Sequence, residues 1–227
     1  MWRMRSDTRL LRFAPLWGLC VALLSLSGCA PLPTGGVPDG LAPTAQATPD
    51  AVLALNRITW GANTSTARVM EQQGSARWLQ QQLQPQGASL PESAQATVSA
   101  MTISQTGLTD LVATMEKQRK EADALRDDVA KKAAQQAYQQ ELNRLAREAA
   151  TRHVLRALYS PAQVQEQMTW FWLNHFNVYL SKHNLRAMLG DYEDSTLRPH
   201  ALGRFRDLLG AVSYHPAMLR YLDNDQN

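Results

Sequence analysis

The densest run of aromatic residues in this chain reads Trp170-Phe171-Trp172-Leu173-Asn174-His175-Phe176-Asn177. A helix built from this run has large apolar side chains on every face of its first turn, so it does not fit a surface helix with one apolar stripe. We therefore expect the run to form a helix that is buried on all sides. Four of the five histidines lie between Ser160 and Asn224, among carboxylates and arginines, so we expect any chemistry in this part of the chain.

The residues around this run predict further short helices. Ser160-Pro161-Ala162-Gln163 is typical of a capping box with proline at the first helical position, which predicts a helix start. Downstream, apolar spacing predicts a helix over 185–189 that ends at Gly190, a helix near 199–212, and a last one over 217–222. In the helix near 199–212 we expect four apolar residues to face the core: Leu202, Phe205, Leu209 and Val212.

The N-terminal half of the chain also has helical patterns. Thr48-Pro49-Asp50 predicts a helix start with a capping hydroxyl, a proline and an acid in the right order. Two more short helices are predicted from about Thr64 and Arg77, and residues 86–107 are predicted to form a loop because their periodicity is weak.

Residues 108–158 keep a heptad-like apolar spacing with one phase shift. One continuous helix of that length would measure about 75 Å, which exceeds a compact domain. We therefore expect a helical hairpin or a projecting arm, with its turn near Asp127-Asp128 or Lys131-Lys132. Eight basic and seven acidic side chains lie between 116 and 148, which is typical of a solvated helix face. Since the sequence shows no strand pattern, it predicts an all-α fold: an irregular multi-helix domain with a long charged hairpin or arm.

Residues 1–28 carry the pattern of a bacterial lipoprotein signal peptide. Four arginines precede an apolar run that is too short to span a bilayer as a permanent helix. Leu26-Ser27-Gly28-Cys29 matches the lipobox, so we expect Cys29 to carry the lipid and to anchor the chain. Alanine rather than aspartate follows the cysteine, which favours the periplasmic face or the outside of the outer membrane. Residues 29–48, rich in Pro, Gly, Ala and Thr, are predicted to be a disordered tether.

Removal of the signal peptide changes the electrostatic picture. Four of the 23 basic and one of the 20 acidic residues lie in it, so 19 of each remain and the predicted mature chain has zero net charge. A bulk electrostatic case for binding nucleic acid is thereby lost. Cys20 leaves with the signal peptide and Cys29 is lipidated, which excludes disulfides, zinc-thiolate sites and cysteine catalysis in the mature chain.

Three segments form a combination that is more specific than helical patterning. They are Leu55-Asn56-Arg57-Ile58-Thr59-Trp60-Gly61 with Trp78-Leu79, then Trp170 to Val178, and then Gly190 to Asn224 with Arg198-Pro199-His200 and Tyr221-Leu222-Asp223-Asn224. Together they resemble the bacterial family of domains of unknown function numbered 1800, whose members are exported helical proteins.

The resemblance covers the domain predicted at 49–227 and marks a charged helical insertion near 108–150. Family members continue past the Tyr-Leu-Asp-Asn element into a helix with acidic residues and a histidine. The resemblance therefore implies that this chain is C-terminally truncated and lacks any site which that helix completes. It implies no established reaction.

Several polar residues of the 160–224 region are candidates for a site. His175 is either a general base or metal ligand, or a buried histidine bonded to a carbonyl or carboxylate. Asp191 and the acids after it either bind a cation or cap the next helix. His200 shares a predicted helix face with Arg204 and Asp207, which would either grip an anionic or sugar ligand or form an intrahelical ion pair. His175, Asp191 and His200 are the candidate catalytic residues.

Four residues are candidates for ligand binding: Asn174, Asn177, Arg198 and Arg204. The sequence predicts no metal site and identifies no cofactor, since it contains none of the common metal or phosphate motifs. Two functions stay open. The first is a lipoprotein of the cell envelope that binds a ligand or a partner, either an envelope protein or a glycan, in its helical domain. The alternative is an envelope hydrolase that acts on a polymer or glycan through a His/Asp site.

Lipidation of Cys29 can be tested in cells. We expect the protein to partition into the detergent phase, and we expect both a Cys29→Ala variant and globomycin treatment to abolish this partition. The physical reason is that no other apolar run of the sequence approaches the ~20 residues that a bilayer span requires. Unchanged partition in both experiments would rule out the lipid anchor.

Overall fold

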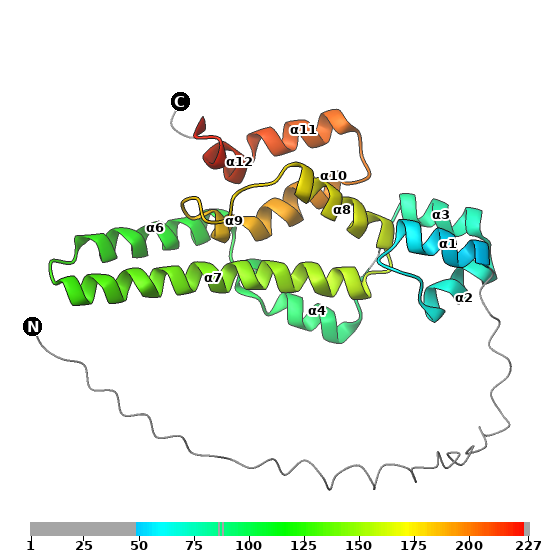
Figure 1. The fold of residues 1–227 in the computed structure, drawn as a ribbon, viewed down its shortest axis with the longest axis horizontal. Coiled ribbons are helices and arrows are strands. Elements are labelled where there is room, and N and C mark those ends of the chain that lie inside the picture. The colour runs from blue at the N-terminus through cyan, green and yellow to red at the C-terminus, as the bar shows by residue number, and fades with distance from the viewer. Residues whose placement is uncertain (1–48, 86, 88, 225–227) are drawn as a thin grey trace, which may run out of the picture. The chain divides into compact units, whose positions relative to one another are not determined.

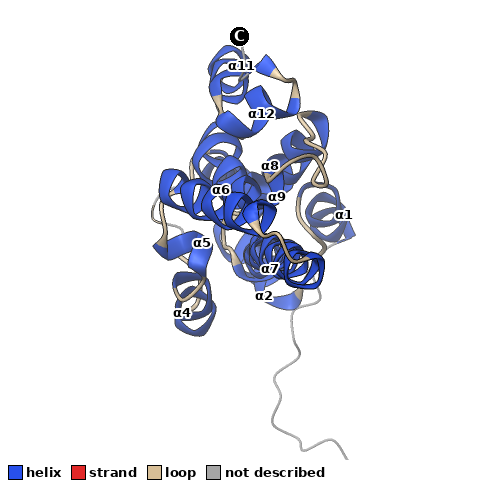
Figure 2. Ribbon diagram, turned by 90° about the vertical axis from the view of Figure 1, so that its left-hand side faces the viewer, coloured by secondary structure: helices blue, strands red, loops and turns tan. Residues whose placement is uncertain are grey.

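Helices and the loops between them make up residues 49–85, 87 and 89–224, which the computed structural model describes (Figure 1). The view in Figure 2 contains no strand within these ranges, so the predicted all-α fold is confirmed. The predicted signal peptide (1–28), the lipidation site Cys29, the tether (29–48) and the Thr48 cap lie outside the described residues.

The elements follow one another with short connections. In chain order they are α1 (Pro49–Ile58), α2 (Thr64–Gln73), α3 (Ser75–Leu83), α4 (Glu92–Ser99), α5 (Thr102–Gln105), α6 (Leu108–Ala124), α7 (Asp128–Tyr159), α8 (Gln163–His175), α9 (Leu185–Asp191), the π-helical segment η1 (Tyr192–Leu197), α10 (Arg198–His200), α11 (Phe205–Tyr214) and α12 (Pro216–Tyr221).

The predicted hairpin is formed by α6 and α7, which lie side by side in Figure 1. Its turn falls at residues 125–127, where the Asp127 side chain accepts a hydrogen bond of 2.7 Å from the Ala130 backbone N–H and caps α7. Of the two predicted turns, the one at Asp127-Asp128 is therefore confirmed. The inner faces of the hairpin pack with α9 in one cluster: Leu111, Met115, Tyr138, Leu142, Leu145 and Ala187.

Two other apolar clusters complete the core. The first surrounds the fully buried Tyr192, whose hydroxyl donates to the Phe176 carbonyl over 2.9 Å, and it includes Val178, Leu185, Met188, Leu197, Leu208, Val212, Ala217 and Met218. The second joins the N-terminal helices and contains Ala51, Leu55, Ala67, Met70 and Trp78. Each N-terminal helix therefore buries one short stripe against the other two.

The loop predicted over 86–107 is wrong for most of its length. Residues 92–99 form α4 and residues 102–105 form α5. In α4 only Ala94 and Val98 are buried, and α4 packs against α7 through this i, i+4 pair. Such a small apolar face leaves a weak periodic signal, although it is enough to hold a short helix on a neighbour.

The start of α8 differs from the predicted capping box. The helix begins at Gln163 and its N-cap is Ala162, so Pro161 precedes the helix. The Ser160 hydroxyl still accepts from the Ala162 N–H over 3.2 Å, while the Gln163 amide donates to the Ser160 carbonyl over 2.8 Å. The box residues thus bond one another, but they stabilise a tight turn between α7 and α8.

Gly190 does not end the helix that begins at Leu185. The chain continues through Asp191 into η1 and α10 without a break. A β-carbon at Gly190 would lie 3.0 Å from the Ile103 side chain and 3.2 Å from the Arg152 guanidinium. Glycine is needed here for close packing against α5 and α7, and the sequence alone does not separate that role from a helix stop.

The helix predicted near 199–212 is interrupted. Residues 201–204 leave the helix, and α11 starts at Phe205. Of the four apolar residues predicted to face the core, Val212 is buried, but Phe205 and Leu209 are 53% and 42% exposed. The interruption rotates α11 so that Leu208 becomes the buried partner of Val212.

The aromatic run is helical but not buried on all sides, so this prediction is wrong. Trp170 is 42% exposed and Phe171 is 51% exposed. The buried residues of α8 lie in its first two turns: Gln163, Val164, Glu166 and Thr169. Trp172 and Phe176 pack against the cluster around Tyr192, whereas Trp170 and Phe171 extend beyond the cover of the neighbouring helices.

Leu142 tests the hairpin core. It is fully buried, so Leu142→Ala is expected to lower the free energy of unfolding by about 2–5 kcal/mol. Val129→Ala, at a residue 77% exposed on the same helix, should change it by less than about 0.5 kcal/mol. Urea unfolding followed by circular dichroism measures both. Equal effects would show that the hairpin is not packed on the domain.

Candidate functional site

Charged side chains gather where η1 crosses α7. Glu193 is 2% exposed, and its carboxylate lies 2.8 Å from Nδ1 of His153 on α7. Its neighbour Asp194 pairs with Arg156 and lies 3.4 Å from the Arg152 guanidinium. The wider turn of a π-helix, which is common at functional sites, lets consecutive acids of η1 both reach α7.

A second buried pair ties α8 to the same region. Glu166 of α8 is 1% exposed and pairs with Arg198. Burial, together with the nearby guanidiniums of Arg156 and Arg152, lowers the pKa of Arg198 to about 9, so its side chain stays charged at neutral pH. Three buried atoms of this network, Glu166 Oε2, Arg198 Nε and Arg152 Nε, have no hydrogen-bond partner within the described part of the chain.

Two tryptophans flank His153. The His153 ring centroid lies 5.0 Å from that of Trp170 and 6.1 Å from that of Trp60, and the two indoles are 6.2 Å apart. Trp60 follows α1, His153 belongs to α7 and Trp170 belongs to α8, so three distant segments meet here.

The three candidate catalytic residues have separate surroundings. His175 is exposed at the end of α8, where its ring contacts Phe171, Trp172 and Phe176. Within the described residues, neither Asp191 nor His200 is bonded to His175; each has other partners.

Asp191 belongs to a small hydrogen-bonded group. His215 Nε2 lies 3.0 Å from its carboxylate and the Ser195 hydroxyl donates over 2.8 Å, and the His215 contact is the main cause of the lowered pKa of Asp191. Since His215 Nδ1 accepts from the Ala217 N–H, both ring nitrogens of His215 are occupied. His200 is bonded to its own helix, because its Nδ1 lies 2.7 Å from the Thr196 carbonyl. The Asp191 group caps α12 and joins it to α9.

The candidate ligand-binding residues are also dispersed. Asn174 is exposed and donates to the Trp170 carbonyl of its own helix, and Asn177 is exposed in the loop after α8. Arg198 holds the buried Glu166. Arg204 is the exposed N-cap of α11, so the predicted helix face that it shares with His200 and Asp207 does not exist.

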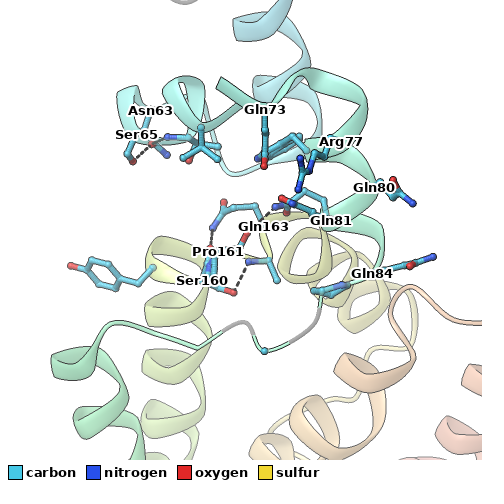
Figure 3. Close-up of a pocket in the computed structure, with 18 of the residues that line it drawn as sticks. Asn63, Ser65, Gln73, Arg77, Gln80, Gln81, Gln84, Ser160, Pro161 and Gln163 are labelled. Atoms are coloured by element: carbon cyan, nitrogen blue, oxygen red, sulfur yellow. Dashed lines mark hydrogen bonds between the residues drawn. The ribbon is translucent and has the colours of Figure 1, made fainter. Parts of the chain in front are cut away.

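A hollow lies between α2 and α3 on one side and the α7–α8 junction on the other (Figure 3). Its volume is about 900 Å³. Amide and hydroxyl side chains dominate its lining, which includes Asn63, Ser65, Thr66, Gln73, Gln80, Gln81, Gln82, Gln84, Ser160 and Gln163. Arg77 is the one charged residue among its described lining residues.

The amides of this hollow differ in how they are bonded. Gln82 donates to the Pro161 carbonyl over 2.9 Å and accepts from the Val164 N–H over 3.3 Å, so it joins α3 to the start of α8. Gln163 donates to the Ala157 and Ser160 carbonyls. In contrast, the Gln73 Nε2 is buried and has no hydrogen-bond partner within the described ranges.

Sequence reasoning missed His153, Trp60 and Gln73 as site residues. His153 is the one histidine outside the 160–224 region, and its partner Glu193 stands 40 residues away. No local pattern connects the two. The cluster Arg152-His153 with Arg156 near the end of a long helix was the available signal.

No helix of the described chain combines the length and the apolar character that crossing a membrane requires. Within the same ranges, no three His, Cys, Asp or Glu side chains come close enough to hold a metal ion.

Residues 53–227 match the model of a family described as protein of unknown function (DUF1800). No curated protein and no solved structure matches the chain.

The Glu166–Arg198 pair yields a stability prediction. Glu166→Leu leaves a buried guanidinium without its partner and is expected to cost about 3–5 kcal/mol of unfolding free energy. A double variant, Glu166→Leu with Arg198→Met, should recover most of this loss because it removes both charges. Glu141→Leu, which breaks a half-exposed pair with Arg144, should cost less than about 1 kcal/mol. Equal losses in the single and double variants would contradict the role of the pair.

Proposed function

Because the chain belongs to the DUF1800 family, whose description assigns no activity, we propose a function from its own residues: it binds an uncharged polar ligand in the hollow between α2, α3 and the α7–α8 junction. The protein would do so as an exported lipoprotein, anchored through Cys29 at the outer membrane. The ligand is then a component of the cell envelope, a glycan or a segment of an envelope protein.

Gln73 is the observation that supports this proposal most directly. A buried amide N–H without a partner costs about 1–3 kcal/mol of stability, so such groups are rare in folded proteins. Here the amide belongs to a residue that lines a hollow large enough for a ligand, as Gln80 and Gln81 also do. If the Gln73 side chain turns its amide toward the hollow, an acceptor on the ligand supplies the missing hydrogen bond.

The lining indicates the chemistry of the ligand. Side-chain amides both donate and accept hydrogen bonds, so they suit hydroxyl and amide groups. With Arg77 as the one charge among the described lining residues, the hollow favours a ligand of little net charge. The hollow also has apolar contact area, which comes from the side chains of Val69, Leu158 and Tyr159.

We propose binding rather than hydrolysis for this site. The hydrolase alternative requires His175, Asp191 and His200 in one cleft, and each of them has its own separate contacts. None of the three lines the hollow.

Gln73→Leu tests the proposal through two opposite effects. Removing the unpartnered amide should raise the unfolding free energy of the free protein by about 1 kcal/mol. The same change should weaken ligand binding about tenfold, or roughly 1.4 kcal/mol. Thermal unfolding measures the first effect. Calorimetry against soluble muropeptides, glycan oligomers and short peptides measures the second.

Gln72→Leu is the matched control, because Gln72 is the exposed neighbour of Gln73 on the same helix. It should leave both quantities unchanged. If Gln73→Leu instead destabilised the free protein, the amide would have a structural partner and the hollow would lose its main support.

A further inference from the structure

We propose that Trp60, His153 and Trp170 form a second binding site, a platform for one neutral sugar ring of a glycan. We call these three residues the indole–imidazole platform. It shares no residue with the lining of the hollow and depends on its own contacts.

Exposure of the two indoles is the first observation. Trp60 and Trp170 are each 42% exposed, although an indole is mostly buried when it only fills a core. Both stand within 6.2 Å, centroid to centroid, of each other and of the His153 ring. His153 belongs to α7 and Trp170 to α8, while Trp60 follows α1 and its backbone N–H lies 3.4 Å from Gln163 Oε1, so the fold positions all three rings. The two indole planes are inclined at 59° to each other, so they form two walls of a corner, and an apolar indole face suits the C–H face of a sugar.

Orientation of His153 is the second observation. Its Nδ1 lies 2.8 Å from Glu193 Oε1, and Glu193 is 2% exposed. A carboxylate accepts hydrogen bonds, so Nδ1 carries the proton and Nε2 of the neutral ring is an acceptor. Within the described chain, Nε2 has no hydrogen-bond partner. A hydroxyl group fits Nε2 in either protonation state, since a hydroxyl both donates and accepts.

The charged side chains next to the platform have no net formal charge, which favours a neutral ligand. Three arginines and three acids form the network next to His153, and their formal charges cancel: Arg152, Arg156, Arg198, Glu166, Glu193 and Asp194. An anion or a cation would gain no attraction from this balanced set, while a sugar needs only the indole faces and the imidazole nitrogen.

The platform also lies next to the start of α8. The Trp60 backbone N–H lies 3.4 Å from Gln163 Oε1, and Gln163 lines the hollow on its other side. Although Gln163 connects the two sites, Trp60, His153 and Trp170 do not line the hollow, so substitutions can change one site and spare the other. If the platform proves not to bind a sugar, the proposed binding in the hollow is unaffected.

Calorimetric titration with three soluble probes tests the platform: an N-acetylglucosamine trimer, maltotriose and xylotriose. We expect the wild-type protein to bind at least one. Trp170→Ala and His153→Ala should each weaken that binding at least about tenfold. Phe171→Ala, at the adjacent exposed aromatic residue, should leave it unchanged, and so should Gln73→Leu.

Folding is checked by thermal unfolding of each variant. Should Trp170→Ala unfold early, Trp170→Phe keeps an aromatic face and is expected to weaken binding several-fold without loss of fold. Nitrogen NMR of His153 gives an independent readout, because the Nδ1–H tautomer should become a mixture in Glu193→Gln. The platform is overturned if no probe binds at millimolar concentration, or if binding survives Trp170→Ala and is lost in Gln73→Leu. The second result would place the sugar in the hollow and support the proposed function.

Discussion

Buried charge where α7, α8 and η1 meet constrains the rest of this domain. Glu166 and Glu193 are almost fully buried, and an unpaired carboxylate in such a place would cost several kcal/mol. Each has a partner from another segment: Glu166 pairs with the guanidinium of Arg198, and Glu193 bonds to the imidazole of His153. These pairs favour one register of the helices. A shift of α8 by one residue would separate Glu166 from Arg198 and leave a buried carboxylate without its partner.

The same buried hydrogen bonds and ion pairs also position the side chains of the two candidate sites. The hydrogen bond between Glu193 and His153 gives the buried carboxylate a partner, and it also orients the His153 ring between two tryptophans. Positioning is thus a by-product of packing, and no ligand has to order the side chains first. Gln82 acts in a similar way on the other side of α8, where it joins α3 to the turn before α8. Gln73 is different, because the fold leaves its buried amide without a partner.

Gly190 and the break in the helix at 201–204 determine how closely the C-terminal helices pack. Gly190 lets Arg152 and Ile103 approach the backbone of α9, and Arg152 donates to the Gly190 carbonyl. The break at 201–204 turns α11 so that Leu208 and Val212 close the cluster around Tyr192. Phe205 and Leu209 remain exposed as a consequence, and the Phe205 ring centroid lies 5.8 Å from that of Trp172.

Local features were readable from the sequence because their causes are local. The absence of strand patterns predicted the all-α fold, and the length of the heptad-like region predicted a hairpin with its turn at Asp127-Asp128 or Lys131-Lys132. The structure has the first of these, where the Asp127 side chain caps α7. Periodicity also placed most helices. It did not show that Trp170 and Phe171 stay exposed, because a pattern reports which faces are apolar and not how far a neighbouring helix extends. Tertiary structure alone decided the candidate sites: His153 and Glu193 are 40 residues apart, and Gln82 and Val164 are 82 apart. Such pairs form only after the helices pack, since hydrogen bonds and ion pairs act over a few ångströms in space, whatever the separation along the chain.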